Sequence, residues 1–310
     1  MSTTFAASVL QTIGNTPLVK LNKIVPQNCA DIYVKLEYFN PTGSYKDRMA
    51  LSIVEEAEKR GDIKEGVKIV EFTGGSTGTS LAFVCAVKGY SFRAITSDAF
   101  AKEKIQSIQL FGADLEIVPS IGGSITPDLF VRMRERVLQL EKEGYYWTKQ
   151  FLNTDAKIGY SYLGKEILQQ VPGRIDVFCA AVGTAGMLLG TAAELKKDDP
   201  STQIIALEPA SSPFLTKGES GSHRVEGTAT GRMPDMLTKE NYDAAMAIDE
   251  ANGRETARLL ASREGIFAGT SSGLNICAAI EIGKKLGPGH TVVTVAVDSG
   301  MKYLAGDLYS

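Results

Sequence analysis

A lysine and three glycine-rich stretches are the parts of this 310-residue chain best suited to chemistry. Lys46 ends a segment, residues 40–45, that contains proline and glycine. The glycine-rich stretches are residues 73–78, 183–186 and 269–273, and each also carries hydroxyl side chains. An unprotonated lysine amine attacks aldehydes and forms a Schiff base. Glycine-rich entrances to helices present N–H groups that bind phosphate or carboxylate. The residues together predict a reactive amine accompanied by anion-binding loops.

Lys46 taken alone leaves two interpretations open. Its segment leads into a predicted helix, so the ammonium group lies near the positive end of the helix dipole. That position, together with partial burial, is expected to lower the pKa of the amine. The other interpretation is an exposed lysine that begins an amphipathic helix, and Lys46 by itself favours this one.

Each glycine-rich stretch also has a plain interpretation, because glycine before a helix can serve only a tight turn. The dinucleotide fingerprint Gly-x-Gly-x-x-Gly is absent from all of them. Three polar helix entrances and a lysine at a fourth make an anion site the better interpretation of the set.

Short apolar runs alternate with helical patterns along the chain. The predicted strands are residues 32–36, 68–72, 92–96, 115–119, 176–181, 204–207 and 291–297. The predicted helices are residues 46–60, residues 77–88, one from Pro127 toward Gly144, one after Asp155 and one after Ser271. This alternation predicts an α/β protein whose parallel sheets are covered on both faces. Ligands of such sheets bind beyond the carboxyl ends of the strands, where the glycine-rich stretches fall.

Composition excludes several classes of function. The net charge is −3 and the pI is about 5.6, so electrostatic binding to nucleic acid or to acidic lipid is not expected. The chain shows neither a signal peptide nor an apolar run of membrane-spanning length. Cys29, Cys85, Cys179 and Cys277 are far apart and have apolar neighbours, which predicts buried thiols in a reducing compartment. We therefore expect a cytoplasmic protein.

The chain resembles the cysteine synthase and cystathionine β-synthase family of pyridoxal 5′-phosphate (PLP) enzymes, which have the tryptophan synthase β-like fold (fold type II). The motifs that carry the resemblance run in order from residues 13–19 to residues 298–304. The resemblance implies two doubly wound domains with mainly parallel sheets. Residues 39–150 would form a smaller, mobile domain, and residues 1–38 with 151–310 a larger cofactor-binding domain. It also implies a homodimer.

The resemblance assigns roles to individual residues. Lys46, in the Asn-Pro-x-x-Ser-x-Lys-x-Arg motif, would carry PLP as a Schiff base and act as general base on the α-proton of the substrate. The implied cofactor-binding residues are Lys46, Ser76, Gly183, Thr184, Ala185, Gly186, Met187 and Ser271. The implied substrate-binding residues are Thr73, Gly74, Gly75, Thr77, Gln150, Gly227 and Arg232. No metal ion is expected.

Three positions depart from the family pattern. Ser76 stands where the family has an asparagine that contacts the ring hydroxyl of PLP, and Gly74 stands where it has a serine. Met187 replaces a threonine in the phosphate loop, so we expect weaker cofactor binding. Ser271 keeps the family serine at the pyridine nitrogen, which favours loss of a β-substituent over transamination. Its neighbours Thr270 and Ser272 are expected to cap the helix.

The predicted activity is β-replacement on an O-activated serine, with O-acetylserine and sulfide giving cysteine and acetate. A transferase or lyase that uses O-phosphoserine, homocysteine or an amine is the alternative on the same scaffold. A catalytically weak PLP protein with a regulatory role is the alternative from another class. Arg232 is as well suited to an anionic substrate group as to solvent, and Asp298 has no account. His223 and His290 are expected at the surface.

Overall fold

A computed structural model describes residues 5–123 and 126–310. The chain forms two compact units, which we call the first unit and the second unit. The first unit is Met1–Ile13 with Asn40–Gly159, and the second is Gly14–Phe39 with Tyr160–Ser310. Each unit contains its own sheet and its own apolar core. The predicted mobility of residues 39–150 stays a prediction.

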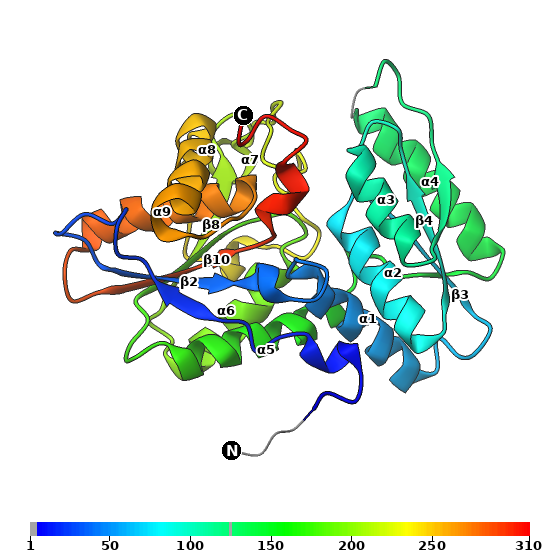
Figure 1. The fold of residues 1–310 in the computed structure, drawn as a ribbon, viewed down its shortest axis with the longest axis horizontal. Helices are drawn as coiled ribbons and strands as arrows, with labels where there is room; N and C mark the ends of the chain where they lie inside the picture. Colours follow the sequence, from blue (N-terminus) through cyan, green and yellow to red (C-terminus); the bar gives the residue numbers. More distant parts are fainter. Residues whose placement is uncertain (1–4, 124–125) are drawn as a thin grey trace. The chain divides into compact units, whose positions relative to one another are not determined.

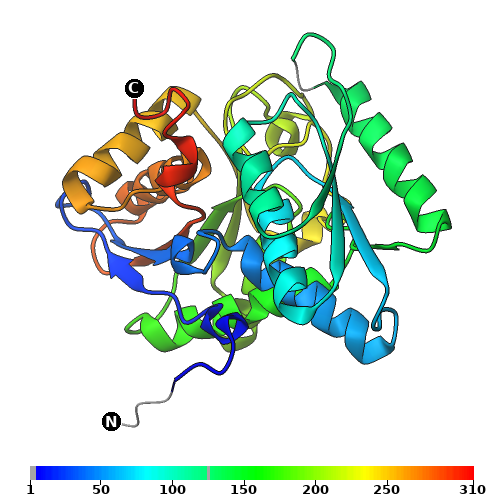
Figure 2. The ribbon, with the colours of Figure 1, turned by 45° about the vertical axis from the view of Figure 1, so that its right-hand side comes forward.

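The sheet of the first unit has four parallel strands in the order β5-β4-β3-β6. The strands are β3 (Lys68–Phe72), β4 (Ser91–Thr96), β5 (Asp114–Ile117) and β6 (Tyr146–Trp147). The helices are α1 (Lys46–Arg60), α2 (Ser76–Lys88), α3 (Lys102–Leu110) and α4 (Pro127–Lys142). Helices α2 and α3 lie on one face of the sheet and α4 on the other, as Figures 1 and 2 show.

Local sequence explains where these helices begin and end. Met49, Ile53 and Ala57 recur at helical spacing on α1 and are fully buried, which confirms the predicted apolar face. The helix ends at Gly61, which adopts a left-handed conformation at φ 77°. Helix α4 begins after Thr126, whose side chain accepts a hydrogen bond from the backbone N–H of Leu129.

The sheet of the second unit has six strands in the order β1-β2-β10-β7-β8-β9, all parallel except for β1. Its strands are β1 (Leu18–Lys20), β2 (Asp31–Leu36), β7 (Val177–Ala181), β8 (Gln203–Pro209), β9 (Ala244–Ile248) and β10 (Thr291–Ala296). Its helices are α5 (Asp155–Gln170, which begins in the first unit), α6 (Gly186–Asp198), α7 (Phe214–Lys217), α8 (Glu250–Leu259) and α9 (Thr270–Leu286). In Figure 1, α5 and α6 cover one face of this sheet, and α8 and α9 lie on the other.

Short helical turns complete the two units. They are η1 (Val9–Thr12), η2 (Glu37–Phe39), η3 (Lys239–Asn241), η4 (Leu260–Glu264) and η5 (Gly300–Tyr303). In the part of the chain that the structure describes, no helix has both the length and the apolar character needed to cross a bilayer.

Each sheet has one point where the direction of winding reverses. In the first unit the chain passes from β3 to β4 and β5 on one side, and β6 then pairs on the other side of β3. In the second unit β8 and β9 follow β7 on one side, whereas β10 pairs on the other. The loops beyond two such strands diverge and leave a crevice at their carboxyl ends, which is where α/β proteins bind ligands.

The prediction of an α/β protein with two doubly wound, mainly parallel sheets is confirmed. All seven predicted strands and all five predicted helices are present, with ends that shift by a few residues. Strands β1, β6 and β9 and helices α3 and α8 were not among the predicted elements. Strands β1 and β6 are only three and two residues long, too short for an apolar run to reveal them.

All four cysteines are buried and carry free thiols, as predicted. Burial raises the pKa of Cys85 and of Cys179 to about 12. At pH 8 only about one in ten thousand of these thiols is ionised, and the thiolate is the nucleophile. We therefore expect iodoacetamide at pH 8 to leave both residues unmodified in the native protein and to modify all four cysteines after unfolding in guanidinium. Peptide mass spectrometry checks this, and native labelling of Cys179 at the rate of a free thiol would contradict it.

Candidate functional site

Lys46 is the first residue of α1 and only 8% of its surface is exposed. Its Nζ lies 4.7 Å from the centre of the Tyr45 ring. The preceding loop is fastened to the helix by Asp47, whose carboxylate accepts hydrogen bonds from the N–H of Thr42 at 2.8 Å and from its hydroxyl at 2.5 Å. The interpretation of Lys46 as an exposed lysine is therefore wrong, and the amine occupies a buried, structured position.

The loop at residues 73–78 joins β3 to α2. The Thr73 hydroxyl accepts hydrogen bonds from the N–H groups of Gly75 at 3.2 Å and Gly78 at 3.3 Å. Helix α2 begins after Gly75 without a side-chain cap. Thr77 is buried and Ser76 is half-buried. Because no side chain caps this helix end, its positive dipole end is suited to an anion.

The structure gives a physical reason for glycine at position 74. A Cβ atom there would lie 2.4 Å from Cε1 of the Phe100 ring. The ring of Phe100 thus occupies the space that a serine side chain would need. The departure from the family pattern at Gly74 is matched by the aromatic residue that packs over it.

Thr77 and Gln150, both predicted to bind the substrate carboxylate, are in direct contact. The Thr77 hydroxyl donates to Oε1 of Gln150 at 2.8 Å, and Nε2 of Gln150 donates to the carbonyl of Phe72 at 3.0 Å. Gln150 follows β6 and Thr77 follows β3, so the contact lies at the winding reversal of the first unit. Both side chains are about 95% buried.

Glu71 is a residue of this region that the sequence reasoning missed. Its carboxylate is fully buried and accepts hydrogen bonds from the two residues that flank Lys149, namely from the hydroxyl of Thr148 and the N–H of Gln150. Burial raises the pKa of the Glu71 carboxyl, and these hydrogen bonds oppose the rise. The available signal was an acidic residue inside an otherwise apolar strand, between Val70 and Phe72.

The loop at residues 183–187 joins β7 to α6 in the second unit. Ala185 adopts a left-handed conformation at φ 68°, and α6 begins after it without a side-chain cap. A Cβ atom on Gly183 would lie 2.2 Å from the carbonyl oxygen of Gly227, so the two backbones touch. Two residues predicted for different roles, Gly183 and Gly227, are therefore neighbours. Thr184, Gly186 and Met187 are buried in this same loop and first turn.

Ser271 is buried in the first turn of α9, but the predicted capping by its neighbours is wrong. The N-cap residue is Gly269, and it provides no side-chain cap. Thr270 and Ser272 lie inside the first turn and are directed to adjoining loops. The Thr270 hydroxyl accepts from the N–H of Glu226 at 3.3 Å, and the Ser272 hydroxyl accepts from the N–H of Val297 at 2.9 Å.

Asp298, which had no account from sequence, lies beside the entrance to α9. Its carbonyl accepts from the N–H of Gly269 at 3.1 Å, and its carboxylate accepts from the Tyr303 hydroxyl at 2.9 Å. Burial, reinforced by the charge of Asp298, raises the pKa of Tyr303 well above its ordinary value. Asp298 thus follows β10 and fixes the backbone just before Ser271.

Arg232 is exposed and already has a partner. Its guanidinium donates two hydrogen bonds to the carboxylate of Asp235, at 3.1 and 3.0 Å. His290 is exposed as predicted, whereas His223 is only half-exposed. Nδ1 of His223 accepts from the N–H of Val225, which leaves Nε2 to donate to the carbonyl of Ala229 at 3.0 Å. His223 therefore holds the loop that carries Gly227.

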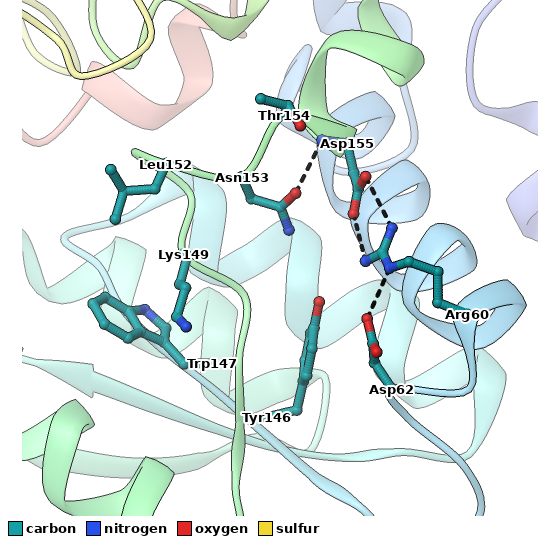
Figure 3. A pocket seen from close by; sticks show the side chains of 9 residues that line it. All are labelled: Arg60, Asp62, Tyr146, Trp147, Lys149, Leu152, Asn153, Thr154 and Asp155. Carbon is teal, nitrogen blue, oxygen red and sulfur yellow. Dashed lines mark hydrogen bonds and ion pairs between the residues drawn. The ribbon is translucent and has the colours of Figure 1, made fainter.

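A hollow of about 430 Å³ in the first unit lies on another side of the segment that carries Gln150 (Figure 3). It is lined by Arg60, Asp62, Tyr146, Trp147, Lys149, Leu152, Asn153, Thr154 and Asp155. Arg60 pairs there with both Asp62 and Asp155, as the dashed lines show. Its charged groups are thus satisfied within the protein, and none of the predicted site residues is among those lining it.

Comparison with known proteins places this arrangement in a family. The model of the family described as pyridoxal-phosphate dependent enzyme matches residues 9–298. The cysteine synthase of Staphylococcus aureus is 43% identical over 305 residues, 98% of this chain and 97% of the relative. The O-ureido-L-serine synthase of Streptomyces lavendulae is 36% identical and covers 97% of this chain and 92% of its own length.

A solved structure shows the same fold. The O-acetyl serine sulfhydrylase isoform 3 from Entamoeba histolytica superimposes with a TM-score of 0.92 at 33% identity, over 100% of this chain and 93% of its own. The resemblance recognised from the motifs is thereby confirmed. This chain belongs to the pyridoxal-phosphate dependent enzymes, and its cofactor is PLP.

Proposed function

We propose that this enzyme catalyses β-replacement on an O-activated serine, with O-acetylserine and sulfide as substrates and cysteine and acetate as products. The bond between the β-carbon and oxygen breaks, acetate leaves, and sulfide forms the new carbon–sulfur bond. The similarity to a cysteine synthase over nearly the whole chain supports this reaction. The contact between Thr77 and Gln150 is the structural observation on which the proposal rests, because it builds a carboxylate-binding corner.

The residues present fit PLP. Lys46 is a buried lysine at a helix start and would anchor the cofactor through Nζ. The close approach of Gly183 to Gly227 and the uncapped start of α6 leave backbone N–H groups for the phosphate, together with the Thr184 hydroxyl. Ser271 would face the ring nitrogen, and Ser76 the ring hydroxyl. When bound, PLP withdraws electrons from the α-carbon of the amino acid.

The protein's own groups would bind the substrate and move its proton. The N–H groups of residues 74–78, the Thr77 hydroxyl and the Gln150 amide would hold the α-carboxylate. Lys46 would take the proton from the α-carbon and return it after the nucleophile has added. Ser271, being neutral, would leave the ring a moderate electron sink, which favours departure of the β-substituent.

The same proposal extends to the state and location of the enzyme. We infer a cytoplasmic homodimer, supported by the family resemblance and by four thiols that are reduced and buried. The similarity to an O-ureido-L-serine synthase keeps a nucleophile other than sulfide in the experiment. O-phosphoserine as donor and a weakly catalytic regulatory role are its remaining outcomes.

The first test combines substrates with a Lys46 variant. The PLP-loaded enzyme should form cysteine from O-acetylserine and sulfide, measured by chromatography, and should form less product with homocysteine or hydroxyurea. Lys46→Ala should lower the rate by about 10²–10⁴-fold, because the base is lost. Borohydride should fix the cofactor on Lys46 of the wild-type protein, located by peptide mass spectrometry. Faster turnover with another donor or nucleophile would replace the proposed substrates, and no turnover at all would favour the regulatory role.

The second test concerns the phosphate loop. Gly183→Ala places a Cβ against the Gly227 carbonyl, so the loop must shift and PLP should be retained about tenfold less tightly. Cofactor absorbance after dialysis measures the loss. Gly164→Ala is the matched control, because its Cβ would lie 2.9 Å from the carbonyl of Thr191, away from this loop. It should lower the denaturation midpoint yet retain PLP. Equal cofactor loss in both variants would contradict a phosphate-holding role.

The third test concerns the donor. Because Asp235 already neutralises Arg232, we expect Asp235→Asn to raise kcat/KM for O-phosphoserine by up to about tenfold and to leave O-acetylserine nearly unchanged. Arg232→Ala should lower kcat/KM for O-phosphoserine much more than for O-acetylserine. Parallel changes for both donors in both variants would show that Arg232 does not contact the substrate.

A further inference from the structure

We infer that Glu71 is the positioning residue of the substrate-carboxylate corner, and that it acts by holding the Gln150 backbone so that the Gln150 side chain meets Thr77. This inference rests on the proposed function, because it assigns a role within the same site. Glu71 lies on β3 and Gln150 lies beyond β6, so the contact spans the point where the two strands separate.

The ladder between β3 and β6 ends where Glu71 begins to act. Its last backbone hydrogen bond runs from the N–H of Thr148 to the carbonyl of Val70 at 3.2 Å. Beyond it, Oε1 of Glu71 accepts from the N–H of Phe72 at 2.9 Å and from Nε1 of Trp147 at 3.0 Å. Oε2 accepts from the Thr148 hydroxyl at 2.6 Å and from the N–H of Gln150 at 2.9 Å. One carboxylate thus replaces the backbone pairing at the opening.

The backbone between these contacts is strained. Lys149 has φ 53°, a left-handed conformation that a residue with a Cβ adopts at a cost. This turn directs the N–H of Gln150 to Glu71 and its side chain to Thr77 and to the Phe72 carbonyl. Such a conformation persists only where neighbouring contacts enforce it. Glu71 supplies contacts on both sides of Lys149.

Donor chemistry shows why a carboxylate is needed. Three of the four donors to Glu71 are N–H groups, which cannot accept, and the fourth is the Thr148 hydroxyl, which can. A glutamine amide that keeps its oxygen toward Phe72 and Trp147 therefore turns its nitrogen toward Gln150. That orientation loses one hydrogen bond, and the reverse orientation loses two. Glu71→Gln should consequently release the N–H of Gln150 while the rest of the network stays paired.

The experiment uses the PLP-loaded enzyme. Glu71→Gln should raise KM for the amino-acid donor by about tenfold, the effect of one buried hydrogen bond, with kcat and PLP content within about threefold of wild type. Thr148→Val is the matched control, because it removes a donor to the same carboxylate oxygen without touching the N–H of Gln150. Its KM should stay within about threefold of wild type.

A double variant separates positioning from stability. If Glu71 acts through Gln150, adding Glu71→Gln to Gln150→Ala should raise KM no further than Gln150→Ala alone. Additive losses, or a fall in kcat and PLP content without a change in KM, would overturn the inference. If Glu71→Gln does not fold, Glu71→Asp replaces it, with the same rise in KM expected because the shorter side chain withdraws from Gln150.

A binding measurement distinguishes this inference from the proposed function. L-serine is titrated into the loaded enzyme while cofactor absorption is followed, so no turnover is needed. Weaker binding in Glu71→Gln than in wild type supports the role of Glu71 even if no cysteine is ever formed. Equal binding in the two proteins would overturn it, whatever the activity of the wild type.

Discussion

Buried backbone groups must be paired, and this requirement becomes acute where two parallel strands separate. At the opening between β3 and β6, the N–H of Phe72 is paired with the Glu71 carboxylate and its carbonyl with the Gln150 amide. Side chains therefore do the work that a neighbouring strand does elsewhere in the sheet. The opening gives room for a ligand, and the same side chains that stabilise it also present Gln150 and Thr77 to that room.

The second unit meets the same requirement by different means. Beyond β10, the N–H of Val297 is paired with the Ser272 hydroxyl, and the carbonyl of Asp298 with the N–H of Gly269. Beyond β7, the carbonyl of Val182 accepts from the N–H of Ala229. Here hydroxyls and close backbone contacts replace the ladder, and glycine at positions where a Cβ would collide makes those contacts possible. Glycine-rich motifs and strand separation are thus two views of one constraint.

Periodicity and glycine placement predicted the helices and most strands, because these signals are local. The roles of Lys46 and Gln150 came from family resemblance, and geometry adds how each is held. Glu71 escaped prediction because its partners Trp147, Thr148 and Gln150 lie 76 to 79 positions away in sequence. Thr270 and Ser272 were misjudged for the same reason, since capping is the local expectation and their actual partners lie 44 and 25 positions away.

Helix starts show what distinguishes a binding loop from an ordinary one. Helices α4 and α8 are capped by the side chains of Thr126 and Asp249, whereas α2, α6 and α9 have no such cap. A missing cap is not sufficient, because α3 also lacks one. At α2, α6 and α9 the uncapped end coincides with glycines packed closely against neighbouring atoms. Losing a hydroxyl at Gly74 or Met187 leaves these backbone donors in place, so the departures from the family pattern remove side-chain contacts and keep the anion-binding design.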